Sequence, residues 1–240
     1  MKTSTVRDAT RSRLPPPLAA PPAHDPVAPF DDLEYIPKVR KSWAERRRAT
    51  IGLTLLAPFA VAALVSPPWL APGSWGEVGV ISTGWLLFLS GAALRLWATL
   101  HIGGRKGREV VAEGPYSITR NPLYFGTFLM TLSSGFFLSS LTLICGVAVA
   151  TMAYVRVTLP SEEKRLASKL GPDYRDYCRL VPRFWPSPAL LRMPATIAVD
   201  LHCLGMELLR SLRWMWLPVA MAAFARLRLE PGWPQWLGLP

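Results

Sequence analysis

Residues 78–100 read VGVISTGWLLFLSGAALRLWATL, and this stretch decides the fold class. As an α-helix it would be about 34 Å long, enough to cross a bilayer hydrocarbon core of about 30 Å. The stretch therefore predicts a membrane-spanning helix. Its one charged side chain, Arg95, leaves two interpretations open: it extends to the membrane interface, or it faces an internal pocket.

Two further apolar stretches lie on either side of this one, at residues 51–70 and 123–158. The second is too long for a single crossing, and a division near Ser139 and Ser140 gives two short helices joined by a tight turn. We therefore expect an all-α integral membrane protein with about four transmembrane helices, including a tight helical hairpin.

The basic side chains lie in short blocks between the apolar stretches. Half of the chain is apolar, 18% is charged, and the net charge is +11. Lys and Arg precede residue 51 and follow residues 100 and 158, whereas residues 66–77 contain none. Cytoplasmic loops carry such an excess, so we expect a multi-pass protein with both termini in the cytoplasm. Nucleic-acid binding by these blocks is disfavoured because apolar stretches separate them.

The two ends of the chain differ in character from the middle. Residues 1–41 are rich in proline and predict a disordered cytoplasmic tail. After residue 188, apolar side chains recur at helical spacing between residues 197 and 215, which predicts an amphipathic helix for a membrane surface or for the protein's own flank. Residues 214–225 are too few to span, so they predict an interfacial or re-entrant segment. The expected domains are thus 1–41, 42–188 and 189–240.

Polar segments border the predicted hairpin on both sides. Residues 114–126 read GPYSITRNPLYFG, in which Pro122 suits the first turn of a helix and Asn121 its N-cap. Arg120 could bind a carboxylate with two hydrogen bonds. The second segment begins at Glu162 and Glu163. These two glutamates are either exposed residues in the first turn of a helix or part of a ligand pocket. Arginine and glutamate beside aromatic rings would suit a zwitterionic ligand such as S-adenosylmethionine.

Metal-binding and disulfide patterns are not found in the sequence. There is no HExxH motif and there are only three histidines, so no metal cofactor is expected. Cys145, Cys178 and Cys203 form no CxxC pair and are expected to be reduced thiols.

Five short motifs follow one another along the chain: GPY at 114–116, RNPLYFG at 120–126, EE at 162–163, GPDYRDY at 171–177 and VPRF at 181–184. With a membrane hairpin between them, they resemble the isoprenylcysteine carboxyl methyltransferase family, whose wider group includes membrane phospholipid N-methyltransferases. The resemblance implies an S-adenosylmethionine-dependent methyltransferase in residues 42–188, with a cofactor pocket at the cytoplasmic face.

The family's motifs imply site residues at matching positions. The implied cofactor-binding residues are Gly114, Pro115, Tyr116, Arg120, Asn121, Pro122, Tyr124, Gly126, Glu162, Glu163, Tyr174, Tyr177 and Arg183, of which Arg120, Glu162 and Glu163 are the implied catalytic residues. His101 precedes the glycine turn at residues 103–107 and is a further candidate for cofactor binding in the same pocket. Many members have Arg-His-Pro where this chain has Asn121. Because asparagine does not titrate, a proton-transfer role is excluded there.

The implied methyl acceptor is lipophilic or lipid-anchored, and either a prenylcysteine-type carboxylate or a lipid amine fits the sequence. Two alternatives belong to other classes. A nicotinamide-dependent membrane reductase of the sterol reductase type has a similar segment, usually with an acidic residue where this chain has Thr127. A non-catalytic membrane scaffold or sensor of the same fold is the other.

Overall fold

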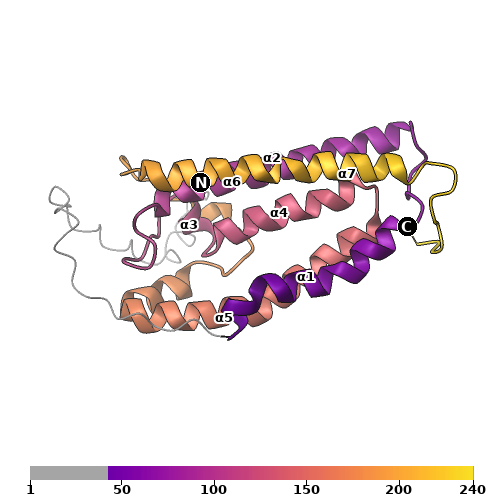
Figure 1. The fold of residues 1–240 in the computed structure, drawn as a ribbon. Coiled ribbons are helices and arrows are strands. Elements are labelled where there is room, and N and C mark those ends of the chain that lie inside the picture. Colours follow the sequence, from indigo (N-terminus) through magenta and orange to yellow (C-terminus); the bar gives the residue numbers. More distant parts are fainter. Residues whose placement is uncertain (1–42, 240) are drawn as a thin grey trace, which may run out of the picture. The chain divides into compact units, whose positions relative to one another are not determined.

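The computed structural model describes residues 43–239, and these fold almost entirely as helices (Figure 1). In chain order the elements are α1 (Trp43–Leu64), α2 (Trp75–Ile102), α3 (Pro115–Ile118), α4 (Pro122–Phe137), α5 (Leu141–Leu180), the short 3-10 helix η3 (Pro188–Leu190), α6 (Leu201–Trp214) and α7 (Trp216–Leu227). The described part contains no β-strand, which confirms the all-α prediction for these residues. The predicted tail, residues 1–41, lies outside them.

Two helices of the described chain, α2 and α5, are long and apolar enough to cross a membrane. The stretch that predicted the first of them is confirmed as part of α2, which begins after the N-cap Ser74. The predicted span 51–70 is wrong in its extent, because α1 ends at Leu64. Pro67 and Pro68 follow, and proline cannot donate the backbone hydrogen bonds that would continue a helix.

The apolar stretch 123–158 divides where the sequence predicted. α4 ends at Phe137, and the hydroxyl of Ser140 accepts a hydrogen bond from the Leu143 amide at the start of α5. The two helices then pack on different neighbours, α4 along α2 and α5 along α1 (Figure 1). Gly126 of α4 lies against Gly91 of α2, where a methyl group would come within 2.7 Å of the opposing carbonyl oxygen.

α5 extends well beyond the apolar stretch. The sequence left open a solvated helix start at Glu162 and Glu163, but no helix begins there: α5 continues through Pro160, and the Ser161 hydroxyl donates to the Thr158 carbonyl instead of capping a helix. The helical geometry is interrupted at Gly171, whose φ of 71° is left-handed, a conformation that glycine adopts without strain. The apolar stretch and both glutamates, Glu162 and Glu163, therefore belong to the same helix.

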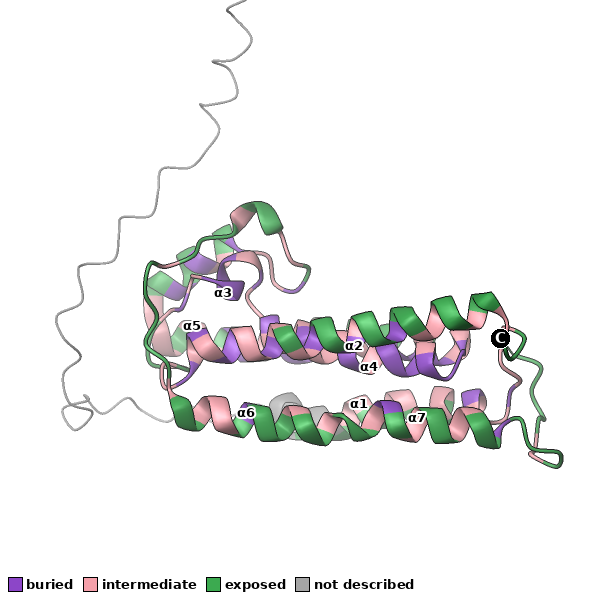
Figure 2. Cartoon of the chain, turned by 90° about the horizontal axis from the view of Figure 1, so that it is seen from above, coloured by how far each residue is buried: buried purple, intermediate pink, exposed green. Residues whose placement is uncertain are grey.

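α6 lies along α2 and α7 along α4, and both helices carry exposed residues along their length (Figure 2). Glu207 is 2% exposed, whereas Leu212 on the outer side is 64% exposed. The amphipathic helix predicted between residues 197 and 215 therefore lies on the protein's own flank. Glu207 of its polar face makes the contact through an ion pair with Arg95 of α2, whereas Arg210 and Arg213 are exposed.

Candidate functional site

A surface cavity of about 310 Å³ lies where the start of α4 meets the polar half of α5. Its polar lining comprises Arg120, Glu163, Lys164, Arg175, Cys178 and Arg183. Four of these side chains are cationic and one is a carboxylate, so the lining carries an excess of positive charge. The volume lies at the lower end of the range for small-molecule sites.

Glu163 lies between two arginines in this cavity. One carboxylate oxygen is 2.9 Å from the Arg183 guanidinium, and the other is 3.4 Å from Nε of Arg120. Both Glu163 and Arg120 are buried, at about one-tenth side-chain exposure. Neither Arg120 Nε nor Glu163 Oε1 has a hydrogen-bond partner of good geometry. Buried polar atoms without a hydrogen-bond partner are rare because they cost free energy, and a polar ligand in the cavity would supply partners for them.

Glu162 points in a different direction from its neighbour. Successive helical residues are rotated by about 100°, and the Glu162 carboxylate accepts a 2.8 Å hydrogen bond from the Tyr124 hydroxyl. The Tyr124 ring packs against Tyr154 of α5. Glu162 is thus held against α4 beside the cavity, and Glu163 lines it.

The residues just before α4 join it to the chain after α5. Arg120 donates to the Cys178 carbonyl at 3.3 Å, and its amide donates to the Pro182 carbonyl at 2.9 Å. Pro122 is the first residue of α4, as predicted. The Asn121 side chain does not cap the helix as expected, because its amide donates to the Arg183 carbonyl at 2.8 Å. Asn121 therefore fixes the backbone that carries Arg183.

A second group of expected site residues joins α5 to α3. The buried Tyr177 hydroxyl donates to the Tyr116 carbonyl at 2.8 Å, which links α5 to α3. Burial raises the pKa of the Tyr116 phenol well above its ordinary range, so this ring stays uncharged. Tyr174 is also buried and packs against Tyr177. Pro115 is the buried first residue of α3.

His101 and Gly114 meet next to this group. The His101 ring is buried, with Nδ1 3.0 Å from the Trp97 carbonyl, and Nε2 has no hydrogen-bond partner. A side chain at Gly114, whose φ is 57°, would collide with the ring. These two residues, and Gly126 in its contact with α2, do not line the cavity.

Sequence reasoning missed three lining residues, Lys164, Arg175 and Cys178. All three lie in the segment after the apolar stretch. Cys178 lies four residues after Tyr174, so the period of the helix could have indicated it, whereas Lys164 and Arg175 directly follow Glu163 and Tyr174 and no such signal indicates them. Arg95 does not extend to the membrane interface but faces the interior of the protein. The side chain is buried, pairs with Glu207 and donates to the Leu123 carbonyl.

The described residues thus form a helical fold with two helices long and apolar enough to cross a membrane, and with a charged cavity beside the polar half of one of them. Residues 84–168 match the isoprenylcysteine carboxyl methyltransferase (ICMT) family. The chain belongs to this family, as the sequence motifs predicted.

Two curated proteins are similar over most of their length. One is the nickel-cobalt-cadmium resistance protein NccN of Alcaligenes xylosoxydans xylosoxydans, which is 30% identical over 70% of this chain and 78% of the relative. The other is the cobalt-zinc-cadmium resistance protein CzcN of Cupriavidus metallidurans, 29% identical over 74% of this chain and 82% of the relative. No solved structure is significantly similar to this chain.

Proposed function

We propose that this protein is a membrane methyltransferase that transfers a methyl group from S-adenosylmethionine to a lipophilic acceptor. The observation that carries the proposal is the Arg120–Glu163–Arg183 cluster in the cavity, which belongs to the part of the chain that resembles the family's motifs. Within this proposal, residues 42–188 form the methyltransferase domain and residues 189–240 form an extension packed on it.

The residues of the cavity fit the chemistry of this cofactor. S-adenosylmethionine, when bound, supplies an electrophilic methyl group. Its amino-acid part has one carboxylate and one ammonium group, which Arg120 and Glu163 would bind with charge-assisted hydrogen bonds. Nε of Arg120 and Oε1 of Glu163 lie 3.4 Å apart but make no hydrogen bond of good geometry, so each atom can still form such a bond to the ligand. Tyr124 and Glu162 would support this wall of the site.

The charge of the lining favours a carboxylate over an amine as the methyl acceptor. Lys164 and Arg175 add two cations beyond those that contact Glu163. An anionic acceptor is attracted by this excess of positive charge, whereas a protonated amine is repelled. Methyl transfer to a carboxylate requires positioning and no prior loss of a proton. We therefore propose that the cationic side chains of the cavity orient the acceptor.

An aromatic group beside Arg183 favours a lipophilic acceptor. The rings of Phe125 and Phe128 on α4 contact those of Phe184 and Trp185, with centroids 5.4 to 6.0 Å apart. Trp185 is 60% exposed. We propose that the hydrocarbon chain of the acceptor lies against these rings while its carboxylate enters the cavity.

We also propose that α1 and α4 cross the membrane with α2 and α5, and that the site faces the cytoplasm. Arg105, Lys106 and Arg108 lie at the end of α2 next to the site, whereas residues 66–77 at the other end contain no Lys or Arg. This asymmetry agrees with the distribution of basic residues in membrane proteins.

Binding of S-adenosylmethionine to the detergent-purified full chain tests the proposal. We expect calorimetry to detect binding and Glu163→Gln to weaken it about 10- to 100-fold, because hydrogen bonds to charged groups contribute about 1.5–3 kcal/mol. Asp176→Asn, an exposed carboxylate later on α5, is the matched control and should bind like the unaltered protein. Absence of binding, preference for a reduced nicotinamide, or equal binding by both variants would contradict the proposal.

A second assay separates the two acceptor classes. Radiolabelled methyl transfer to a prenylcysteine-type carboxylate gives an ester that alkali hydrolyses, whereas transfer to a long-chain amine gives a product that alkali leaves intact. We expect the alkali-labile product. An alkali-stable product alone would refute the carboxylate assignment and leave the methyltransferase proposal in place.

A further inference from the structure

α6 and α7 are each too short to cross a membrane, but they form one nearly continuous helical segment. They are separated by Met215 alone, whose φ of −61° and ψ of −19° are themselves helical. The interruption has a local cause: Pro218 has no amide hydrogen to donate to the carbonyl four residues earlier, at Trp214. Residues 201–227 together extend about 40 Å, longer than the hydrocarbon core of a bilayer.

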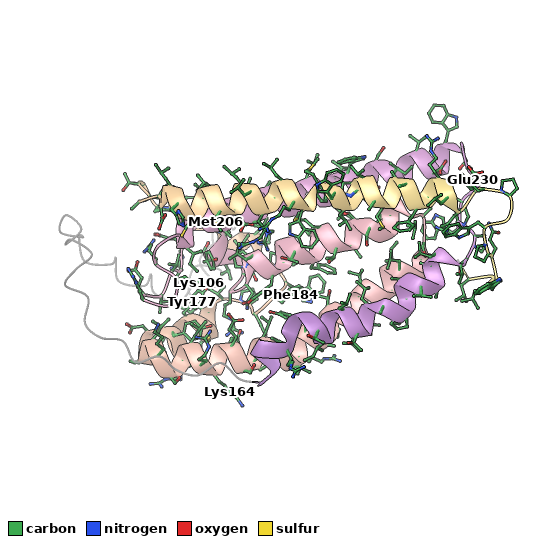
Figure 3. All side chains as sticks on the ribbon, viewed as in Figure 1. Lys106, Lys164, Tyr177, Phe184, Met206 and Glu230 are labelled. Carbon is green, nitrogen blue, oxygen red and sulfur yellow. The ribbon has the colours of Figure 1, made fainter. Side chains whose placement is uncertain are left out.

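The two ends of this segment lie at opposite ends of the helical bundle. At its start, Asp200 lies next to Gly103, where α2 ends beside the site. At its finish, Arg228 donates to the carbonyls of Ser66, after α1, and of Leu138, after α4. Figure 3 shows the same separation: Glu230 lies at one end, and Lys106, Lys164 and Tyr177 lie toward the other. α6 and α7 therefore run antiparallel to α2 along its length.

Large apolar side chains are exposed along the whole length of the segment. The exposed side chains include Leu201, Leu209, Leu212, Trp216 and Val219, with exposures of 54% to 77%. Burial on a protein in water places the apolar side of a helix inward. Here α7 packs Leu217, Met221 and Phe224 inward and α6 buries Glu207, yet large apolar side chains remain exposed on the outer side as well. Exposed apolar side chains of this kind suit a surrounding of lipid acyl chains.

The charged residues of the segment are compatible with this surrounding. Arg210 pairs with Glu207 at 2.5 Å. Arg213 is exposed near the middle of the segment, about 18 Å from its start, and its charge requires water or lipid head groups drawn into the hydrocarbon layer, as for other arginines in membrane helices. Arg228 is 1% exposed and binds helix-end carbonyls. A buried arginine of this kind is a structural cap and does not mark a cytoplasmic loop.

We propose that α6 and α7 together form a membrane-spanning segment whose outer face is covered by lipid acyl chains, so that the C-terminus lies on the opposite side of the membrane from the candidate site. The inference replaces the expected cytoplasmic C-terminus. It also explains the segment that follows: the Trp233 indole donates to the Leu64 carbonyl, and the Leu237 amide donates to the Val65 carbonyl. These bonds fasten the C-terminal segment to the end of α1.

Labelling of single cysteines in the full-length protein tests the proposal. The background replaces Cys145, Cys178 and Cys203 by serine, and a membrane-impermeant maleimide is applied to right-side-out and inside-out vesicles. The test position is Glu230→Cys, with Arg179→Cys as the reference at the site end and Ala71→Cys as the reference at the other end; all three positions are exposed. We expect Glu230→Cys to react from the same side as Ala71→Cys and from the opposite side to Arg179→Cys.

Reaction of Glu230→Cys from the same side as Arg179→Cys would overturn the proposal. A second position tests the lipid contact itself. Leu212→Cys should be unreactive from both sides in vesicles and should react fully once the protein is denatured in detergent, which also proves that the thiol is present. Reaction of Leu212→Cys in intact vesicles would show that α6 lies in water. Neither outcome depends on cofactor binding, so the test is independent of the proposed function.

Discussion

Removal of Glu207 is expected to be among the most destabilising changes that a single side chain can produce here. Its carboxylate lies 2.7 Å from the Arg95 guanidinium, and the two side chains are 3% and 10% exposed. Glu207→Ala leaves the Arg95 charge buried, with hydrogen bonds only to the Leu123 carbonyl and the Thr127 hydroxyl. Breaking a buried pair on one side costs about 3–5 kcal/mol.

The assay is reversible unfolding of the detergent-solubilised protein by increasing SDS, followed by tryptophan fluorescence. The matched control is Asp176→Ala, which removes an exposed partner of Arg179 and should cost less than about 1 kcal/mol. A double variant, Arg95→Leu with Glu207→Leu, should be less destabilised than Glu207→Ala, because no unpaired charge remains buried. If Glu207→Ala lost no more stability than Asp176→Ala, the reasoning about this pair would be refuted.

Two further changes test other parts of the structure. Gly126→Ala should destabilise the fold by about 1–3 kcal/mol, because the added methyl meets a carbonyl oxygen of α2 at 2.7 Å; Gly205→Ala, with open space around it, should be neutral or stabilising by up to about 1 kcal/mol in the same SDS titration. Asp200 caps α6, and the hydrogen bond from the Cys203 backbone amide lowers its pKa. A carboxyl whose pKa is lowered by folding stabilises the protein above its unfolded pKa of about 3.9 and loses that contribution as the pH falls through the folded pKa. The melting temperature of the unaltered protein should therefore exceed that of Asp200→Ala at pH 6, and the difference should shrink below pH 4; a difference that stays constant with pH would exclude the charged cap.

Local patterns in the sequence determined the helices and the order of the motifs. The apolar stretch 78–100 predicted α2, and the serines near residue 139 predicted the turn before α5, because apolar length and helix-breaking residues act on adjacent positions. Pro122 marked the start of α4 for the same reason. The motif residues Arg120 and Glu163 were also predicted, since their short motifs are readable without the fold.

Contacts between distant residues were decided by the tertiary structure alone. Whether Glu162 or Glu163 lines the cavity depends on the rotation of α5 against α4, and the sequence of two identical neighbours cannot distinguish them. Arg95 has its partner, Glu207, 112 residues later in the chain, and this pairing places the Glu207 side of α6 against the protein. The sequence determined that α6 is amphipathic, but which face meets the protein was decided by the energy of leaving a charge buried without its partner.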